Sequence, residues 1–153
     1  MSARDAPNAT VESFGYPETL IADYRHWVVL LRPQQVTLGS LVLACTEPAT
    51  AFSEIGAAAF DELGRAVGDI EASLGESFAY DKINYLMLMM VDPHVHFHVL
   101  PRYAAPRSFA GATFADAGWP AAPDLKAVNE IAAEQRARLI AHLREGWPGL
   151  AGP

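Results

Sequence analysis

Cysteine, long apolar runs and clustered basic residues are all scarce in this chain of 153 residues, and each scarcity excludes a class of protein. The single cysteine, Cys45, cannot form an internal disulfide, so nothing indicates an oxidising compartment. No apolar run reaches the roughly 18–20 residues of a membrane-spanning helix. Residues 1–10 are polar and lack the apolar centre of a secretory signal. We therefore expect a cytoplasmic protein with no membrane partner.

Basic residues are too few to favour a nucleic-acid polymer as the partner. Lysine and arginine number 11 against 18 aspartates and glutamates, which gives a formal net charge of −7 with neutral histidines. Binding to a nucleic acid depends on clustered Lys and Arg that neutralise phosphates. A small phosphorylated ligand remains compatible with this charge, because a pocket needs only a few local donors.

Apolar residues, by contrast, are plentiful. They make up 51 % of the chain, against 19 % charged residues, which favours a folded protein with a sizeable core. The length suits one domain, so we expect a single domain over residues 1–153.

Two pairs of strands and two helices are expected along the chain. Runs of β-forming residues predict the strands, and apolar residues spaced three and four apart predict the helices. A polar break predicts a turn in the first strand pair, and Asp92-Pro93 predicts a tight turn in the second. The expected strands cover residues 27–31, 38–45, 82–90 and 94–101; the expected helices cover 53–74 and 124–144, and a loop covers 104–123.

Three of the five histidines, His94, His96 and His98, alternate with apolar residues in one of these strands. Successive side chains of a strand point to opposite faces, so the three imidazoles are expected to share one face. A solvated strand face is one interpretation of such a row. The alternation of three histidines in so short a stretch favours a functional one.

A metal site is the second interpretation, because histidine is a common zinc ligand. On a straight strand the outer two Cα atoms lie about 13 Å apart, since each residue advances about 3.3 Å. Zinc ligands lie about 2.0–2.1 Å from the metal, so only two neighbouring histidines could share one ion. The sequence offers no Cys pair or distinctive carboxylate motif as further ligands, and we expect no metal and no cofactor.

Nucleophilic catalysis is the third interpretation. A neutral imidazole is nucleophilic near pH 7, because its unperturbed pKa of about 6.5 leaves much of it unprotonated. One neighbouring histidine can then donate to a phosphate oxygen while the other fixes the tautomer of the central ring. This arrangement suits displacement at phosphorus, where positioning and charge neutralisation dominate.

The segment His94–Leu100 resembles the His-φ-His-φ-His-φ-φ signature of the histidine-triad (HIT) superfamily, where φ is an apolar residue. The following Pro101-Arg102 resembles the Pro-Arg of its diadenosine polyphosphate hydrolase branch. The early hairpin with Gly39, the helix after it and the strand bearing Asn84 also correspond, so the resemblance covers residues 20–103. It implies an α+β fold: an antiparallel sheet of about five strands, one long helix packed on it, a C-terminal loop and helix over 104–153, and usually a homodimer.

The resemblance also implies an activity, which is nucleotide hydrolysis or nucleotidyl transfer. His96 would attack the α-phosphate of a small nucleotide and form a nucleotidyl-histidine intermediate that water then hydrolyses. His98 would orient His96 or stabilise its charge through a backbone carbonyl, and His94 would contact phosphate oxygens. Asn84 would bind phosphate or ribose.

Three further residues are candidates for substrate binding. Arg102 has the charge and fork geometry for a phosphate, and Gln35 lies in the turn of the first hairpin. Ser40 stands after Gly39, where the family often has histidine. The segment 90–93 also departs from the family, since it replaces a polar, Gly-rich loop with a tight turn, which bears on leaving-group protonation and substrate choice.

The register of Asn84 and the type of function stay open at the sequence level. A two-residue loop at Asp92-Pro93 would turn Asn84 away from the histidines, whereas an odd-length loop or a bulge would turn it toward them; the resemblance favours the second. Two rivals to the enzyme also remain, a nucleotide-binding module with little or no turnover and a zinc-binding protein.

Overall fold

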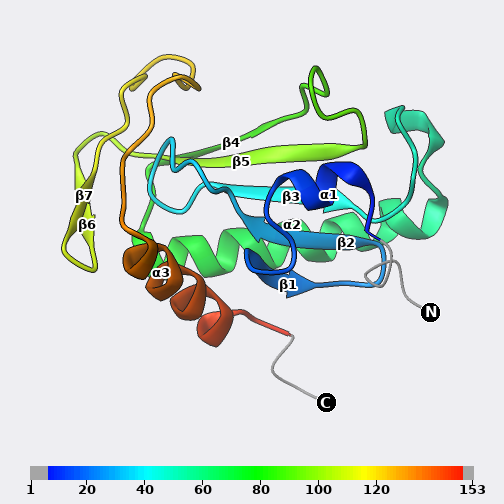
Figure 1. Cartoon of the computed structure of the whole chain (residues 1–153), viewed down its shortest axis with the longest axis horizontal. Coiled ribbons are helices and arrows are strands. Elements are labelled where there is room, and N and C mark those ends of the chain that lie inside the picture. Colours follow the sequence, from blue (N-terminus) through cyan, green and yellow to red (C-terminus); the bar gives the residue numbers. More distant parts are fainter. Residues whose placement is uncertain (1–6, 150–153) are drawn as a thin grey trace.

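Valine- and leucine-rich segments form the centre of a five-stranded antiparallel sheet in the computed structural model, which describes residues 7–149 (Figure 1). All four strand pairings are antiparallel, and the strands lie in the order β1-β2-β3-β5-β4. Their bounds are β1 (Leu20–Asp23), β2 (Trp27–Leu31), β3 (Leu41–Cys45), β4 (Lys82–Leu86) and β5 (His96–Arg102). The expected α+β class and five-stranded sheet are confirmed.

The two central strands β2 and β3 are buried along their whole length. Both faces of the sheet are covered there, which explains why these strands are continuous apolar runs rather than alternating ones. The expected hairpin is confirmed, but β3 begins at Leu41 instead of residue 38. The residues before Leu41 form a loop held by side-chain hydrogen bonds rather than by strand pairing.

The long helix α2 (Ala57–Phe78) covers one face of the sheet. Its buried residues, Ala59, Ala66, Ile70 and Leu74 among them, pack on the β2 and β3 side chains that alternate toward it. The helix begins and ends four residues later than expected. Residues 52–54 form a separate 3₁₀ turn, and Gly75 lies inside the helix, which stops only where Ala79 adopts a left-handed conformation with φ 47°.

The opposite face of the sheet is covered by a short helix that the sequence analysis missed, α1 (Ala9–Ser13), drawn in blue in Figure 1. Asn8 caps it, since its side-chain oxygen accepts the backbone N–H of Val11 at 2.9 Å. Val11 and Phe14 pack on the residues of β2 and β3 that point away from α2, namely Val28, Leu30, Val42 and Ala44. The sheet is therefore enclosed between α2 and the N-terminal segment.

The connection between β4 and β5 differs from the expected tight turn. Leu86 pairs with His98, so the strands are linked by residues 87–95 and not by Asp92-Pro93 alone. Both strands are shorter than expected at this end. As a consequence, His96 opens β5 and His94 lies in the loop before it.

The C-terminal part adds a hairpin and a helix. The hairpin, β6 (Arg107–Phe109) and β7 (Ala112–Phe114), lies inside the expected loop 104–123. The helix α3 (Ala133–Gly146) begins nine residues later than residue 124, and it packs Leu139 and Leu143 into the core. No helix within the described residues is long and apolar enough to cross a bilayer.

Candidate active site

Strand β5 presents His96 and His98 on the face of the sheet that carries α1. They pair with Ala44 and Val42 of β3, which are in the apolar cluster under α1. The two imidazole rings meet edge to face, with centroids 5.1 Å apart and planes at 76°. Both side chains are deeply buried, at 1 % exposed for His96 and 8 % for His98. The predicted alternation is thus confirmed for these two histidines.

The tautomer of His96 follows from one short hydrogen bond. Its Nδ1 lies 2.7 Å from the backbone carbonyl oxygen of His94. A carbonyl oxygen only accepts, so Nδ1 carries the proton and Nε2 keeps a free lone pair. The carbonyl that orients His96 therefore belongs to His94, and not to His98 as the sequence analysis expected.

His98 is held in the opposite tautomer by an arginine that the sequence analysis did not select. Arg32 donates its Nε–H to Nδ1 of His98 over 3.3 Å. A guanidinium only donates, so Nδ1 of His98 is unprotonated and its proton is on Nε2. Burial is the largest cause, and the positive charge of Arg32 the next, of a pKa of His98 that is lowered to about 4. His98 is neutral near pH 7 and offers one N–H donor.

Arg32 follows β2 and is half-buried beside the histidines. Its Nη1 donates to the carbonyl of Gln34 at 2.8 Å. Burial lowers the pKa of the guanidinium, but the ordinary pKa of arginine is so high that the group stays charged. Within residues 7–149, no carboxylate lies within 4 Å of it to form an ion pair. The site therefore holds a positive charge that is free to meet an anion.

His94 is fixed by the N-terminal helix rather than by the sheet. The hydroxyl of Thr10 accepts the backbone N–H of His94 at 3.2 Å and lies 2.9 Å from its Nδ1. Thr10 itself is buried. The side chain of His94 thus points to α1, and its backbone carbonyl is what reaches His96.

A cavity of about 340 Å³ opens at the two buried histidines. Phe14 covers their rings, with centroid distances of 5.5 Å to His96 and 5.6 Å to His98. Arg32 and Gln34 line one part of the cavity, and the loop before β5 lines another. That loop segment is Leu88, Met89, Met90, Val91 and Asp92.

Gln35 and Ser40, expected to bind substrate, are turned inward by the loop between β2 and β3. The amide nitrogen of Gln35 donates to the carbonyls of Arg32 and Ser40, and its oxygen accepts the N–H of Gly39. The Ser40 hydroxyl donates to the Thr37 carbonyl at 2.8 Å and accepts the Thr37 N–H. Both residues are fully buried and shape the loop. Gln34, one residue earlier, lines the cavity instead.

Asn84 and Arg102 lie on the histidine face but not at the histidine cavity. Asn84 pairs with Leu100, two residues from His98, so it faces the side that the resemblance favoured. Its side-chain oxygen accepts the Nη1–H of Arg102 at 2.7 Å. Arg102 also makes a two-pronged ion pair with Asp116, at 2.7 and 3.0 Å, and donates to the carbonyl of Ala121. Arg102 is therefore buried and fully engaged within the protein, where the sequence analysis expected a phosphate ligand.

The ion pair dominates the electrostatics around Asp116. Burial alone would raise the pKa of its carboxyl, but the hydrogen bonds and charge of Arg102 outweigh burial and lower it. Asn84 and Arg102 line a separate cavity of about 380 Å³, together with Lys82 and Trp119.

Metal ligands are not gathered at either place. Within residues 7–149, no three His, Cys, Asp or Glu side chains are arranged to hold a metal ion. Cys45 is buried in the core, and burial raises the pKa of its thiol to about 11, so the free thiol stays protonated near neutral pH.

Comparison with known proteins gives no match to a family model or to a curated protein, but it does identify solved structures with the same fold. A histidine triad protein from Bradyrhizobium japonicum superposes with a TM-score of 0.69 at 18 % identity, covering 93 % of this chain and 97 % of that one. One from Sinorhizobium meliloti gives a TM-score of 0.70 at 18 % identity, covering 91 % and 94 %. A zinc-bound histidine triad family protein from Mycobacterium smegmatis gives 0.60 at 15 % identity, covering 93 % and 96 %. The chain therefore has the histidine-triad fold, as the resemblance implied.

Proposed function

We propose that this chain, which has the histidine-triad fold, is a nucleotidyl hydrolase or transferase with His96 as its nucleophile. Its substrate would be a small nucleotide with a phosphoanhydride or phosphoramidate bond at the α-phosphate. The observation that carries the proposal is the 2.7 Å hydrogen bond from Nδ1 of His96 to the His94 carbonyl. It leaves Nε2 as the reactive nitrogen of a ring that lines a cavity.

In the first step, Nε2 of His96 attacks the α-phosphorus, a P–N bond forms, and the bond to the leaving group breaks. The leaving oxygen or nitrogen takes a proton from water. The imidazole becomes cationic on transfer, and the His94 carbonyl stabilises that charge through the Nδ1 proton. In the second step, water attacks the phosphorus and gives one proton to solvent, which replaces the proton taken in the first step. The P–N bond breaks, and a nucleoside monophosphate leaves with His96 regenerated.

Two neighbours are suited to the phosphate oxygens. His98 is neutral, with its proton on Nε2, so it can donate one hydrogen bond to a non-bridging oxygen. Arg32 supplies a fixed positive charge without a carboxylate partner in the described residues. Positioning and charge neutralisation of this kind are the main sources of catalysis in phosphoryl transfer.

We extend the proposal to a cytoplasmic homodimer. Strand β4 ends the sheet and pairs only with β5 among the described strands, so its outer edge is available for a second copy. The exposed rings of Phe52 and Phe60 meet at a tilt of 42° with centroids 5.4 Å apart, and Phe52 also contacts Phe97 of β5. Light scattering on the eluting protein would give the mass of a dimer if this face is an interface, and that of a monomer if it is not.

A nucleotide-binding module with little turnover remains the second candidate. Two observations favour it: His96 is almost fully covered, and the loop segment before the histidines offers only Asp92 as a charged group. A zinc-binding protein is the third, since one similar structure holds zinc. Metal analysis of the purified protein distinguishes the zinc-binding protein from the other two candidates, because stoichiometric zinc would favour it.

The decisive experiment is intact-protein mass spectrometry after brief incubation with diadenosine tetraphosphate or an adenosine phosphoramidate. The reaction is quenched without acid, because a phosphoramidate linkage is acid-labile. We expect an adenylyl adduct or AMP release in the wild type, and neither in His96→Ala.

His94→Ala is the matched control, because the same substitution two residues away keeps the backbone carbonyl that orients His96. It should retain most of the turnover, whereas His96→Ala should lose more than roughly a thousandfold. Equal, small effects of both substitutions would contradict His96 as the nucleophile. Nucleotide binding without adduct or product would favour the non-catalytic module.

A further inference from the structure

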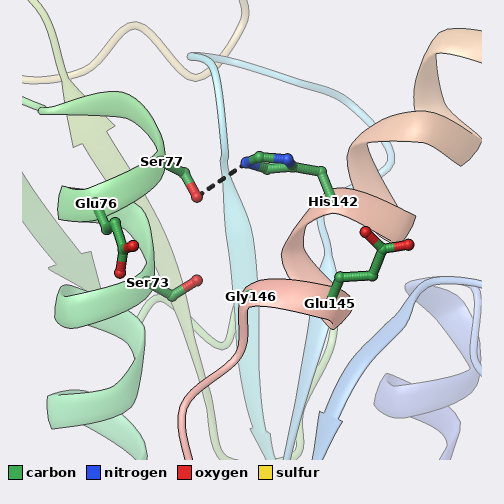
Figure 2. A pocket seen from close by; sticks show the side chains of 6 residues that line it. All are labelled: Ser73, Glu76, Ser77, His142, Glu145 and Gly146. Atoms are coloured by element: carbon green, nitrogen blue, oxygen red, sulfur yellow. Dashed lines mark hydrogen bonds between the residues drawn. The ribbon is translucent and has the colours of Figure 1, made fainter.

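A third cavity, of about 410 Å³, lies between the C-terminal ends of α2 and α3 (Figure 2). It shares no lining residue with the histidine cavity and lies on the other side of the sheet, where α2 packs. Its lining comes from the last two turns of the two helices: Ser73, Glu76, Ser77, His142, Glu145 and Gly146.

Ser73 brings a buried polar atom to this cavity without any partner. The residue is 3 % exposed, and its hydroxyl oxygen makes no hydrogen bond with any part of residues 7–149. Figure 2 shows the Ser73 hydroxyl directed from α2 toward α3, into the space between the helices. Buried hydroxyls are almost always paired, because an orphan destabilises a fold. Its persistence at a cavity wall points to a ligand that satisfies it.

The charges around the cavity favour a cation. Glu76 and Glu145 lie in the last turns of their helices, where the negative end of the helix dipole disfavours acidic side chains. Among the described residues, no lysine or arginine lines the cavity. Arg107, which binds the carbonyls at the end of α2, is not among the lining residues. Arg144 on α3 is likewise engaged elsewhere, by the carbonyl of Leu20.

The polar groups of the lining fit an ammonium better than a metal. No three His, Cys, Asp or Glu side chains of the described residues are arranged to coordinate an ion, and Nε2 of His142 is 3.1 Å from the Ser77 hydroxyl. An ammonium needs no coordination sphere, because its three N–H donors reach separate acceptors about 2.7–3.2 Å away. The lining offers two carboxylates and the orphan hydroxyl of Ser73 as hydrogen-bond acceptors.

We propose that the cavity between α2 and α3 is a binding site for an alkylammonium group, separate from the histidine site. Ser73 accepts one N–H from the buried side, while Glu76 and Glu145 balance the charge from the open side. The ammonium can come from a small free amine or from a lysine side chain of another protein. Both sources present the same chemistry to the cavity.

The test is a titration of the uniformly ¹⁵N-labelled protein with n-butylammonium chloride, followed by amide chemical shifts at constant ionic strength. We expect saturable shifts of the lining residues in α2 and α3. Tetramethylammonium has the same charge but no N–H donor, and n-butanol has the alkyl chain but no charge, so both should bind much more weakly. A parallel titration with Nα-acetyl-lysine methylamide distinguishes the sources, because tighter binding than n-butylammonium would favour a lysine of a partner protein.

Three variants identify the acceptors. Ser73→Ala should raise the Kd for n-butylammonium roughly tenfold, because it removes a buried hydrogen bond to a charged group. It should not lower the melting temperature of the free protein, since the hydroxyl has no internal partner. Glu76→Gln and Glu145→Gln should each raise the Kd roughly two- to fivefold, as expected for exposed ion pairs.

Glu134→Gln is the matched control, because it makes the same charge change in the first turn of α3, away from the cavity. Its Kd should equal that of the wild type. The proposal is overturned if n-butylammonium shifts no lining amide, if n-butanol or tetramethylammonium shifts the same amides equally, or if Glu134→Gln weakens binding as much as Glu145→Gln.

Discussion

The Nε–H of Arg32 points at Nδ1 of His98 across 3.3 Å, which joins a permanent cation to an imidazole that must stay neutral to accept it. The two residues are 66 positions apart in the sequence: Arg32 directly follows β2 and His98 lies in β5, and these two strands flank β3. The contact fixes the tautomer of His98 and holds the guanidinium at the cavity. It couples the charge state of one histidine to the placement of the Arg32 guanidinium.

Replacing Arg32 should therefore change the titration of His98. Burial is the main cause of its low pKa, and the charge of Arg32 is the next. In Arg32→Gln we expect the pKa of His98 to rise from about 4 part of the way toward 6.5, measured from the Cε1–H signals of the imidazoles as pH varies. Arg138→Gln on the exposed side of α3 is the control and should leave the pKa unchanged. An identical His98 titration in Arg32→Gln would show that the guanidinium exerts no field on the ring.

Acid should destabilise the fold through the same histidine. In the unfolded chain His98 takes up a proton near pH 6.5, whereas in the folded protein it does so only near pH 4. Between these values the unfolded state binds more protons, so stability rises with pH and is fully present above about pH 6.5. The loss on acidification to pH 4 amounts to about 3 kcal/mol from this residue.

Urea unfolding at pH 7.5 and pH 4.5 measures this loss. His98→Asn keeps an acceptor for Arg32 but cannot titrate, so its stability should fall less than that of the wild type over the same interval. Arg138→Gln, at an exposed site outside the cavity, should fall as much as the wild type. If His98→Asn and the wild type lose equal stability, the low pKa of His98 is wrong.

The sequence predicts those features of the histidine site that depend only on neighbouring residues in the chain. Alternation along a strand is a property of neighbouring residues, so the shared face of His96 and His98 could be expected from their spacing alone. His94 fails the same rule because the strand begins two residues later, where α1 binds the chain through Thr10. Helix α1 has only five residues, and its short amphipathic pattern gave no signal.

Long-range partners account for the other differences. Gln34 and Gln35 are adjacent and chemically identical, yet only the first lines the cavity, because the second is used to fold the loop back on Ser40. Arg32 and Arg102 are both arginines near strand ends. Only Arg102 has its charge balanced by a carboxylate, because Asp116 lies beside it in the fold. Neither choice can be made from residue type or periodicity.

Phe14 should control access to His96. Its ring covers both histidines, so the smaller side chain in Phe14→Ala opens the cavity to solvent. We expect diethyl pyrocarbonate to modify His96 faster in this variant, measured by mass spectrometry of the peptide that carries His96. Val11→Ala removes another apolar side chain from the same helix and serves as the control for general loosening. Equal acceleration in both variants would mean that the helix as a whole, and not the Phe14 ring, limits access.

Arg102 should act on stability and not on the nucleotide. Its side chain and that of Asp116 are 4 % and 1 % exposed, and removing one partner of such a buried pair leaves the other charge without compensation. Arg102→Met should therefore lower the free energy of unfolding by about 3–5 kcal/mol, as measured in urea. The double variant Arg102→Met/Asp116→Leu should recover most of that loss, because an apolar pair of similar volume often replaces a buried ion pair without penalty. Since neither residue lines the histidine cavity, the double variant should also bind AMP as tightly as the wild type. A large loss of AMP affinity in a folded double variant would instead show that Arg102 takes part in substrate binding.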